Sequence, residues 1–378
     1  MVRRTLRLTL EYDGSGFSGW ARQPDRRTVE GAISDALERL WPGSTATLAV
    51  AGRTDAGVHA SQQVVSVVVV GGPPSERVGD ALRSHLDPDI AVIAASEAQP
   101  GFHARFSALA RRYEYRVLVR RARAPLRARR SLHHATAVDR ATLDTCAALV
   151  VGDHDFGAFT PTETPGDRRR RHVVSCNWRD EGDELVLAIE ADAFLHHMVR
   201  TLVGTMLETA RGQRELAAFA RLLEGVPREQ AGVTAPAHAL MLVGVRYAGD
   251  GPGGDRVRCL VTRDRGGERE LLVIERSAGV ACLPIGSFAP EERVDSAAYR
   301  AVSAASGVLL TSIPRPLGLQ VEELGAVGER RTRAVWLDAP DGLDASWEHA
   351  GVACRFVPLS QAAAFPEARR IPQGLFMS

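Results

Sequence analysis

The chain has 378 residues, 45% of them apolar, and a formal net charge of +1. This length predicts two or three domains rather than one. Apolar runs all stay below 18 residues, and Met1–Thr5 leads directly into an alternating strand pattern, so we expect a cytoplasmic protein with neither a membrane span nor a secretion signal.

The cysteines and the charged residues indicate which metal, redox and nucleic-acid-binding properties to expect. The five cysteines are widely spaced and form no CxxC pair, which predicts free thiols rather than disulfides or a zinc site. Every basic residue is arginine, and residues 1–130 carry 20 arginines against 13 acidic side chains. Arginine runs at 120–130 and 168–171 are most often solvated loops, but a guanidinium also binds phosphate bidentately and stacks on bases.

Along the chain, alternating apolar runs predict strands and 3.6-residue spacing predicts helices. The predicted strands lie at 3–12, 47–50, 64–70, 91–95, 113–119, 185–190 and 271–275. The predicted helices lie at 28–40, 76–85, 141–151 and 199–210, the first with Thr28 as its N-cap. Because the glycine-rich fingerprint of a Rossmann domain is missing, we predict an α+β fold with mostly antiparallel sheets.

One loop carries the strongest chemical signal. Asp55 lies between Gly52 and Gly57, with Arg53 before it and His59 after it, and strand-like runs flank the whole segment. Glycines at these positions allow a sharp bend or a close approach to a ligand. The residues alone leave two interpretations open: a carboxylate nucleophile or base with a cation beside it, or a turn aspartate that hydrogen-bonds its own backbone.

Several motifs resemble, in this order, the TruA family of tRNA pseudouridine synthases over residues 3–247. They are Glu11–Trp20, Thr28–Gly31, Ala51–Ala60, Phe102–Ala108, Arg112–Tyr115, Phe194–Gly204 and Thr234–Ala237. The resemblance implies two related halves, about 3–105 and 106–247, with sheets side by side and a cleft between them. It also implies a tRNA partner, a homodimer and no cofactor. Ala21, Glu30 and Ala239 depart from the family pattern, but none lies in the Asp55 loop.

The resemblance also implies roles for five residues. Asp55 matches the catalytic aspartate, and Arg200 matches the arginine that pairs with it. Tyr113 matches the tyrosine that stacks on the target uracil, although a tyrosine in a strand more often simply packs in the core. Arg53 resembles the residue that enters the gap left by the flipped base, and Arg105 is expected to bind a phosphate or close the cleft.

Three histidines near these motifs are candidates for titrating groups or metal ligands. His59, His196 and His197 have no third ligand at the spacing of known zinc enzymes. Structural roles are therefore favoured, and we predict no metal site.

Residues 248–255 have the composition of a flexible linker, and 256–378 carry a second signal. A helical stretch is predicted to open at Gly286–Glu292 and to run to Gly307. Its spacing resembles a Nudix box, with closing elements at 347–349 and 356–359, which implies a Nudix-like α/β/α domain. Alanines 301, 304 and 305 replace the box's metal-binding glutamates, so a non-hydrolytic role with an unidentified ligand or partner is expected.

The leading functional hypothesis is a tRNA pseudouridine synthase that acts at positions 38–40 of the anticodon stem-loop, as the family does. Two alternatives remain at this stage. One is a Nudix-type nucleotide pyrophosphatase that uses residues 256–378. The other is a non-catalytic RNA-binding protein, which the joint presence of Asp55, Tyr113 and Arg200 disfavours.

Overall fold

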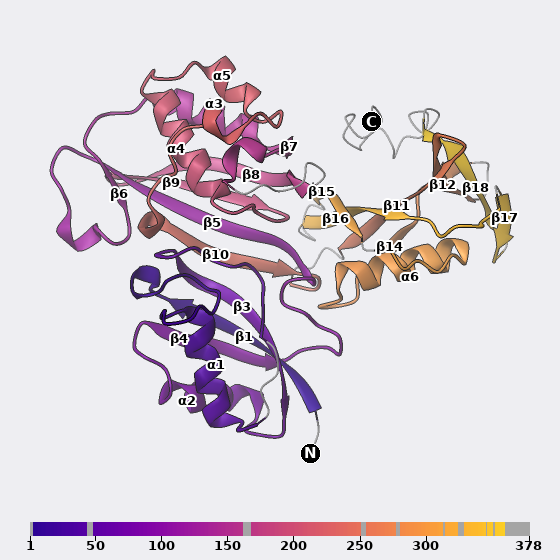
Figure 1. The fold of residues 1–378 in the computed structure, drawn as a ribbon, viewed down its shortest axis with the longest axis horizontal. Helices are drawn as coiled ribbons and strands as arrows, with labels where there is room; N and C mark the ends of the chain where they lie inside the picture. Colours follow the sequence, from indigo (N-terminus) through magenta and orange to yellow (C-terminus); the bar gives the residue numbers. More distant parts are fainter. Residues whose placement is uncertain are drawn as a thin grey trace. The chain divides into compact units, whose positions relative to one another are not determined.

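The computed structural model describes residues 3–43, 48–161, 168–250, 255–276, 280–312, 314–323, 329–344, 346–350 and 352–359. The chain forms two compact units, Met1–Arg246 and Tyr247–Ser378 (Figure 1). None of the helices in these ranges is both long and apolar enough to cross a membrane.

The first unit is built on one sheet in the order β4-β1-β3-β10-β5-β9-β8-β7, with β2 beside β3 and β6 beside β5. Its strands are β1 (Arg3–Tyr12), β2 (Ala49–Val50), β3 (His59–Val70), β4 (Ile90–Glu97), β5 (Ala108–Val119), β6 (Leu132–His134), β7 (Gly152–Asp155), β8 (Arg170–Glu181), β9 (Glu184–Ala191) and β10 (Leu240–Tyr247). Its α-helices are α1 (Val29–Leu40), α2 (Val78–Arg83), α3 (Arg140–Val150), α4 (Met198–Ala210) and α5 (Leu216–Arg221).

The sheet divides into two parts that meet between β3 and β10. On each side of that junction the neighbouring strands are mainly antiparallel, as in β1 with β3 and β5 with β9. The junction itself is a short parallel pairing in which Met241 faces His59 and Leu242 faces Ala60. The predicted α+β class with mostly antiparallel sheets is confirmed, and strands from residues 3–105 and from residues 106–247 form one continuous sheet.

Local sequence accounts for most of these elements. β1 alternates apolar and polar residues, and Leu6, Leu8 and Leu10 are fully buried. α1 begins after Thr28, whose side chain accepts a hydrogen bond from the Gly31 amide, as the N-cap pattern predicts.

One predicted helix is shorter than its pattern suggested. The helix expected over 76–85 is a 3-10 turn at Ser75–Arg77 followed by α2, which ends at Arg83. Pro74 precedes the turn and the backbone there is extended, so the regular helix begins later.

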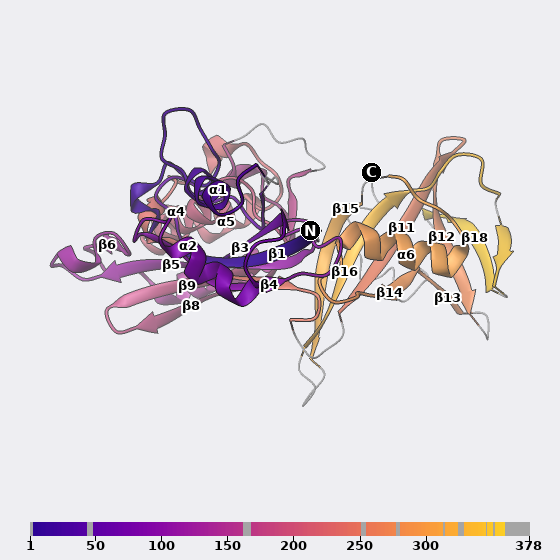
Figure 2. The same cartoon turned by 90° about the horizontal axis from the view of Figure 1, so that it is seen from below.

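The helices of the first unit share one hydrophobic core with the sheet. In Figure 2, α1, α4 and α5 lie on the same side of the strands. α4 is the most deeply buried, because it packs against α3, α5 and β5. A methyl group added at Gly204 of α4 would lie 1.8 Å from the Val233 carbonyl oxygen, so glycine is required for the 233–235 segment to lie against this helix.

The second unit is a separate mixed sheet with a single long helix among its described residues. Its strands are β11 (Arg256–Arg265), β12 (Glu268–Arg276), β13 (Val280–Cys282), β14 (Ile285–Ser287), β15 (Arg315–Glu323), β16 (Glu329–Asp338), β17 (Ser346–His349) and β18 (Val352–Pro358). The main sheet order is β15-β16-β11-β12-β18-β17, and α6 (Val294–Ser306) packs on β11 and β14.

The predicted start of the helix in this unit is wrong, and the predicted linker is described only in part. The helix predicted to open at Gly286 begins at Val294, because Gly286 pairs with Val257 in the sheet and Pro290 and a left-handed Glu291 interrupt the chain. Of the predicted linker, residues 251–254 lie outside the described ranges. At its start, Asp250 accepts a hydrogen bond from the Tyr247 amide.

Candidate active site

Asp55 is lifted out of the sheet by a short loop between β2 and β3. The loop is anchored through its backbone, since Trp20 N–H donates to the Thr54 carbonyl at 2.9 Å and Val58 N–H donates to the Asp55 carbonyl at 3.1 Å. Gly57 has a φ of +80°, a left-handed conformation that glycine adopts without strain. The backbone therefore fixes the direction in which the Asp55 side chain points.

A buried polar network holds the loop from beneath. The Tyr12 and Thr54 hydroxyls are 2.8 Å apart, and Gln63 Nε2 donates to the Gly52 carbonyl at 2.7 Å. Gln63 and Tyr12 are buried, and burial raises the pKa of Tyr12 to about 12. The Tyr12 hydroxyl therefore stays protonated and keeps its hydrogen bonds over the physiological pH range.

The Asp55 carboxylate forms an ion pair with Arg200 of α4. Arg200 NH1 donates to Asp55 Oδ2 at 2.8 Å, and Arg200 Nε donates to the Ala235 carbonyl at 2.8 Å. The side chains of Asp55 and Arg200 are 20% and 14% exposed, so solvent screens the pair only partly. Ala235 belongs to the segment that lies close to Gly204, so this contact orients the guanidinium.

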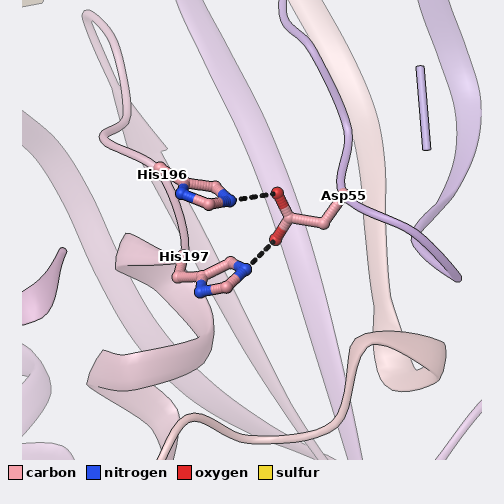
Figure 3. A group of neighbouring side chains, drawn as sticks. All are labelled: Asp55, His196 and His197. Carbon is pink, nitrogen blue, oxygen red and sulfur yellow. Dashed lines mark ion pairs between the residues drawn. The ribbon is translucent and has the colours of Figure 1, made fainter. Parts of the chain in front are cut away.

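Two adjacent histidines face the same carboxylate (Figure 3). His196 Nε2 lies 3.5 Å from Asp55 Oδ1, and His197 Nε2 lies 3.5 Å from Asp55 Oδ2. Their rings lie against each other, with 3.9 Å between centroids and an interplanar angle of 37°. His197 immediately precedes α4 with a φ of 61°, a left-handed conformation that costs a non-glycine residue about 1–2 kcal/mol. Burial lowers the pKa of His197, although Asp55 acts in the opposite direction.

Asp55 opens into a pocket of about 790 Å³ lined by residues from both halves of the sheet. Tyr113 of β5 forms part of the wall, with its ring held edge-on by Phe194 at 5.0 Å. Burial raises the pKa of Tyr113 well above its ordinary value, with Tyr12 and Asp55 adding to the shift. Its hydroxyl is therefore a neutral donor rather than a base.

Arginines and one exposed aromatic ring lie at the pocket's edge. Arg53 and Arg105 are exposed and line the pocket, as does Arg171 of β8. Phe106 is 47% exposed and lies under the Arg105 guanidinium at 5.7 Å. Guanidinium groups and an open aromatic face are the groups that contact phosphates and unstacked bases.

Arg111 is a buried residue that sequence reasoning did not single out. Its guanidinium donates to the carbonyls of Ala51, Arg105, Ala108 and Asp192 at 2.8 to 3.2 Å. These carbonyls lie at the start of the Asp55 loop, in the Phe102–Ala108 region and just before Phe194. One side chain therefore fixes three segments that line the pocket. Its period-two relation to Tyr113 along β5 was the available signal.

His59 has a structural role, as the sequence favoured. It is 1% exposed, and its Nε2 contacts the carbonyls of Arg129 and His238 at 2.9 and 3.0 Å. The Gly14 amide donates to its Nδ1 at 3.1 Å. Burial lowers the pKa of His59, in agreement with a neutral ring that donates through Nε2.

The five candidate residues named from the sequence all lie at one pocket. Asp55 and Arg200 are in direct contact, Tyr113 forms the wall, and Arg53 and Arg105 stand at the edge. Reasoning from the sequence missed Arg111, the Tyr113–Phe194 contact and the approach of both histidines to Asp55. The approach of the histidines to Asp55 brings together segments that are far apart in the chain, so a local sequence pattern does not predict it.

Comparison with known proteins assigns the class. The family model described as tRNA pseudouridine synthase matches residues 9–107 and 146–248, and the chain belongs to this family of isomerases. It is similar to tRNA pseudouridine synthase A of Chloroflexus aurantiacus, with 44% identity over 65% of this chain and 89% of the relative. It is 39% identical to tRNA pseudouridine synthase A of a Methylobacterium species over 65% of this chain and 98% of the relative.

A second likeness is much weaker. The NUDIX domain of Shewanella oneidensis NrtR complexed with ADP ribose is 18% identical over 30% of this chain and 78% of that chain. The TM-score is 0.25, which is too low to establish a common fold.

Replacing Arg111 by lysine is expected to destabilise the first unit by about 2–4 kcal/mol, because a single ammonium cannot reach all four carbonyls and leaves buried acceptors unsatisfied. Urea unfolding of the full chain measures the effect. Arg112→Lys is the matched control, since Arg112 is the exposed neighbour on the same strand. Equal midpoints for the two variants would contradict the role assigned to Arg111.

Proposed function

We propose that this chain isomerises uridine to pseudouridine at positions 38–40 of the tRNA anticodon stem-loop, with Asp55 as the catalytic carboxylate. The observation that carries the proposal is the Asp55–Arg200 ion pair at a pocket whose wall is Tyr113. The tRNA substrate follows from the family, and positions 38–40 are proposed from the resemblance of the sequence motifs to the TruA family.

The reaction sets clear demands on the site. The N1–C1′ bond must break, the uracil must turn, and a bond must form between C5 and C1′. The target nucleotide must first leave its stack, since a base inside a duplex is inaccessible. Three kinds of group meet these demands. They are a carboxylate close to the sugar and the ring, an aromatic surface that holds the detached uracil, and cations that hold the backbone.

Two carboxylates line the pocket, and their contacts distinguish them. Glu30 accepts a hydrogen bond from the Arg22 amide at 2.8 Å, which ties it to the turn before α1. Asp55 instead forms an ion pair with the Arg200 guanidinium at 2.8 Å. A partly buried carboxylate with a cation beside it is the group that can attack carbon or accept a proton, so we assign the chemistry to Asp55.

The other residues take supporting roles in the proposal. Tyr113 stacks on the uracil and keeps it in place while it turns. Arg53 fills the space that the flipped nucleotide leaves, a stacking task suited to a planar cation. Arg105 holds a backbone phosphate at the edge of the pocket.

Replacing Asp55 by asparagine or alanine is expected to lower pseudouridine formation by at least about a hundredfold, since a group in the bond-breaking step is removed. tRNA binding should persist, because affinity is spread over many phosphate contacts. Single-turnover assays and filter binding measure the two quantities, and mapping of pseudouridine in tRNA from cells with and without the chain identifies the position.

Glu30→Gln is the control, because it removes the other carboxylate of the pocket. A tenth of the original rate in Asp55→Asn would exclude the catalytic role. Modification at positions other than 38–40 would refute the specificity while leaving the activity in place.

Tyr113→Phe is expected to keep tRNA affinity, since stacking requires only the ring, whereas Tyr113→Ala should lose about 1–3 kcal/mol of stacking. Affinity measured with a tRNA whose target base is already flipped or unpaired separates the two variants. Equal affinities for the phenylalanine and alanine variants would refute stacking by Tyr113.

For the second unit we propose a binding role rather than hydrolysis. Glu292 and Arg300 form an ion pair at 2.7 Å, and Arg300 also donates to the Ser287 carbonyl, so the loop is tied to α6. Ala301 is buried against Gly286 and offers no ligand oxygen. The full chain is expected to release no phosphate or mononucleotide from dinucleoside polyphosphates with Mg²⁺, as chromatography would show. Magnesium-dependent hydrolysis that survives Asp55→Asn would overturn this proposal.

A further inference from the structure

Asp55, His196 and His197 bring three metal-ligating atoms together. All lie within 4.8 Å of one another, and in the described part of the chain this is the one such group of three. Figure 3 shows both imidazoles directed at the two carboxylate oxygens. Successive residues of an extended chain point to opposite sides, and the left-handed backbone of His197 places both rings on the same side.

The nitrogen-to-oxygen distances bear on whether these groups form hydrogen bonds or are spaced as the ligands of a metal ion. Each histidine Nε2 lies 3.5 Å from a carboxylate oxygen, longer than the roughly 2.7–3.2 Å of a good N–H···O hydrogen bond. Ligands held at about 2.1 Å around a tetrahedral zinc ion are about 3.4 Å apart. Each of the two spacings therefore matches one edge of a metal coordination shell and is long for a hydrogen bond.

We infer that Asp55, His196 and His197 form a site for a transition-metal cation of the Zn²⁺ class, and that occupation of this site blocks the pocket. Two imidazoles and one carboxylate with an open fourth position suit Zn²⁺ or Co²⁺, whereas Mg²⁺ and Ca²⁺ prefer oxygen ligands. The site is reversible and inhibitory, since the cation engages the carboxylate that the proposed reaction needs.

The neighbouring Arg200 is compatible with such a cation. Its hydrogen bond goes to Asp55 Oδ2, while Asp55 Oδ1 faces His196. His197 lies 3.5 Å from the same Oδ2, and a carboxylate oxygen has two lone pairs. A cation on the side of the carboxylate that faces the histidines therefore leaves the Arg200 contact in place. The positive guanidinium lowers the affinity without closing the site.

Binding is tested without reference to activity by titrating Co²⁺ into the metal-free full-length chain. The expected result is one equivalent of Co²⁺ with the intense visible absorption of low-coordinate cobalt, displaced by Zn²⁺. His196→Ala, His197→Ala and Asp55→Asn should each weaken binding at least about tenfold, while His154→Ala, a histidine outside the pocket, should not change it.

The spectrum also identifies the ligands. The five cysteines are buried, so a thiolate-to-cobalt charge-transfer band would place the metal on a cysteine and overturn the assignment. Unchanged Co²⁺ binding in both histidine variants would overturn it as well.

The blocking step rests on the proposed function and is tested separately. Zn²⁺ should inhibit pseudouridine formation, and saturating tRNA should weaken Co²⁺ binding by the same factor by which Co²⁺ weakens tRNA binding, because coupling is reciprocal. Co²⁺ binding that tRNA does not affect would keep the site and refute the block. A chain that binds Co²⁺ but makes no pseudouridine would refute the proposed function alone.

Discussion

The ion pair between Asp55 and Arg200 connects the two halves of the first unit at the pocket. Asp55 comes from the loop after β2 and Arg200 from the first turn of α4, so their contact requires the two parts of the sheet to be joined correctly. The short parallel pairing of β3 with β10 makes that junction. Because both side chains are mostly buried, a displacement of either half would leave a charge poorly solvated, which is costly. The pair therefore constrains the domain architecture as well as the chemistry.

Around this pair the protein uses neutral polar groups and backbone carbonyls rather than further carboxylates. Arg111 is held by carbonyl oxygens, and the Tyr12–Thr54–Gln63 network lies beneath the loop. Neutral acceptors stabilise a guanidinium without competing for Arg200. Arg200 therefore remains available to pair with Asp55 at the pocket. The hydrogen bonds of Arg111 and of the Tyr12–Thr54–Gln63 network also rigidify the three segments that form the pocket wall.

Local sequence patterns predicted the helices and strands whose formation depends on residues close together in the chain. The bounds of β1, the Thr28 cap of α1 and the approximate positions of α3 and α4 follow from periodicity and capping. The start of α6 did not, because pairing of Gly286 with β11 is a tertiary contact that overrides a helical pattern. The family resemblance named Asp55, Arg200 and Tyr113. It gave no sign of Arg111, whose four acceptors come from separate segments.

His196 and His197 show the same limit of local sequence patterns, which do not reveal contacts between distant segments. A search for metal ligands at fixed spacing treats His196 and His197 as a pair without a third partner. The fold supplies that partner from the other half of the sheet. The carboxylate that the proposed reaction needs is also an oxygen ligand, and with two imidazoles it makes a donor set for a borderline cation such as Zn²⁺. A partly buried pocket that brings one carboxylate and two imidazoles together attracts metals as a consequence of those groups. Arg200 then does two things at once: it pairs with Asp55 in the pocket, and its positive charge limits how tightly a competing cation is held.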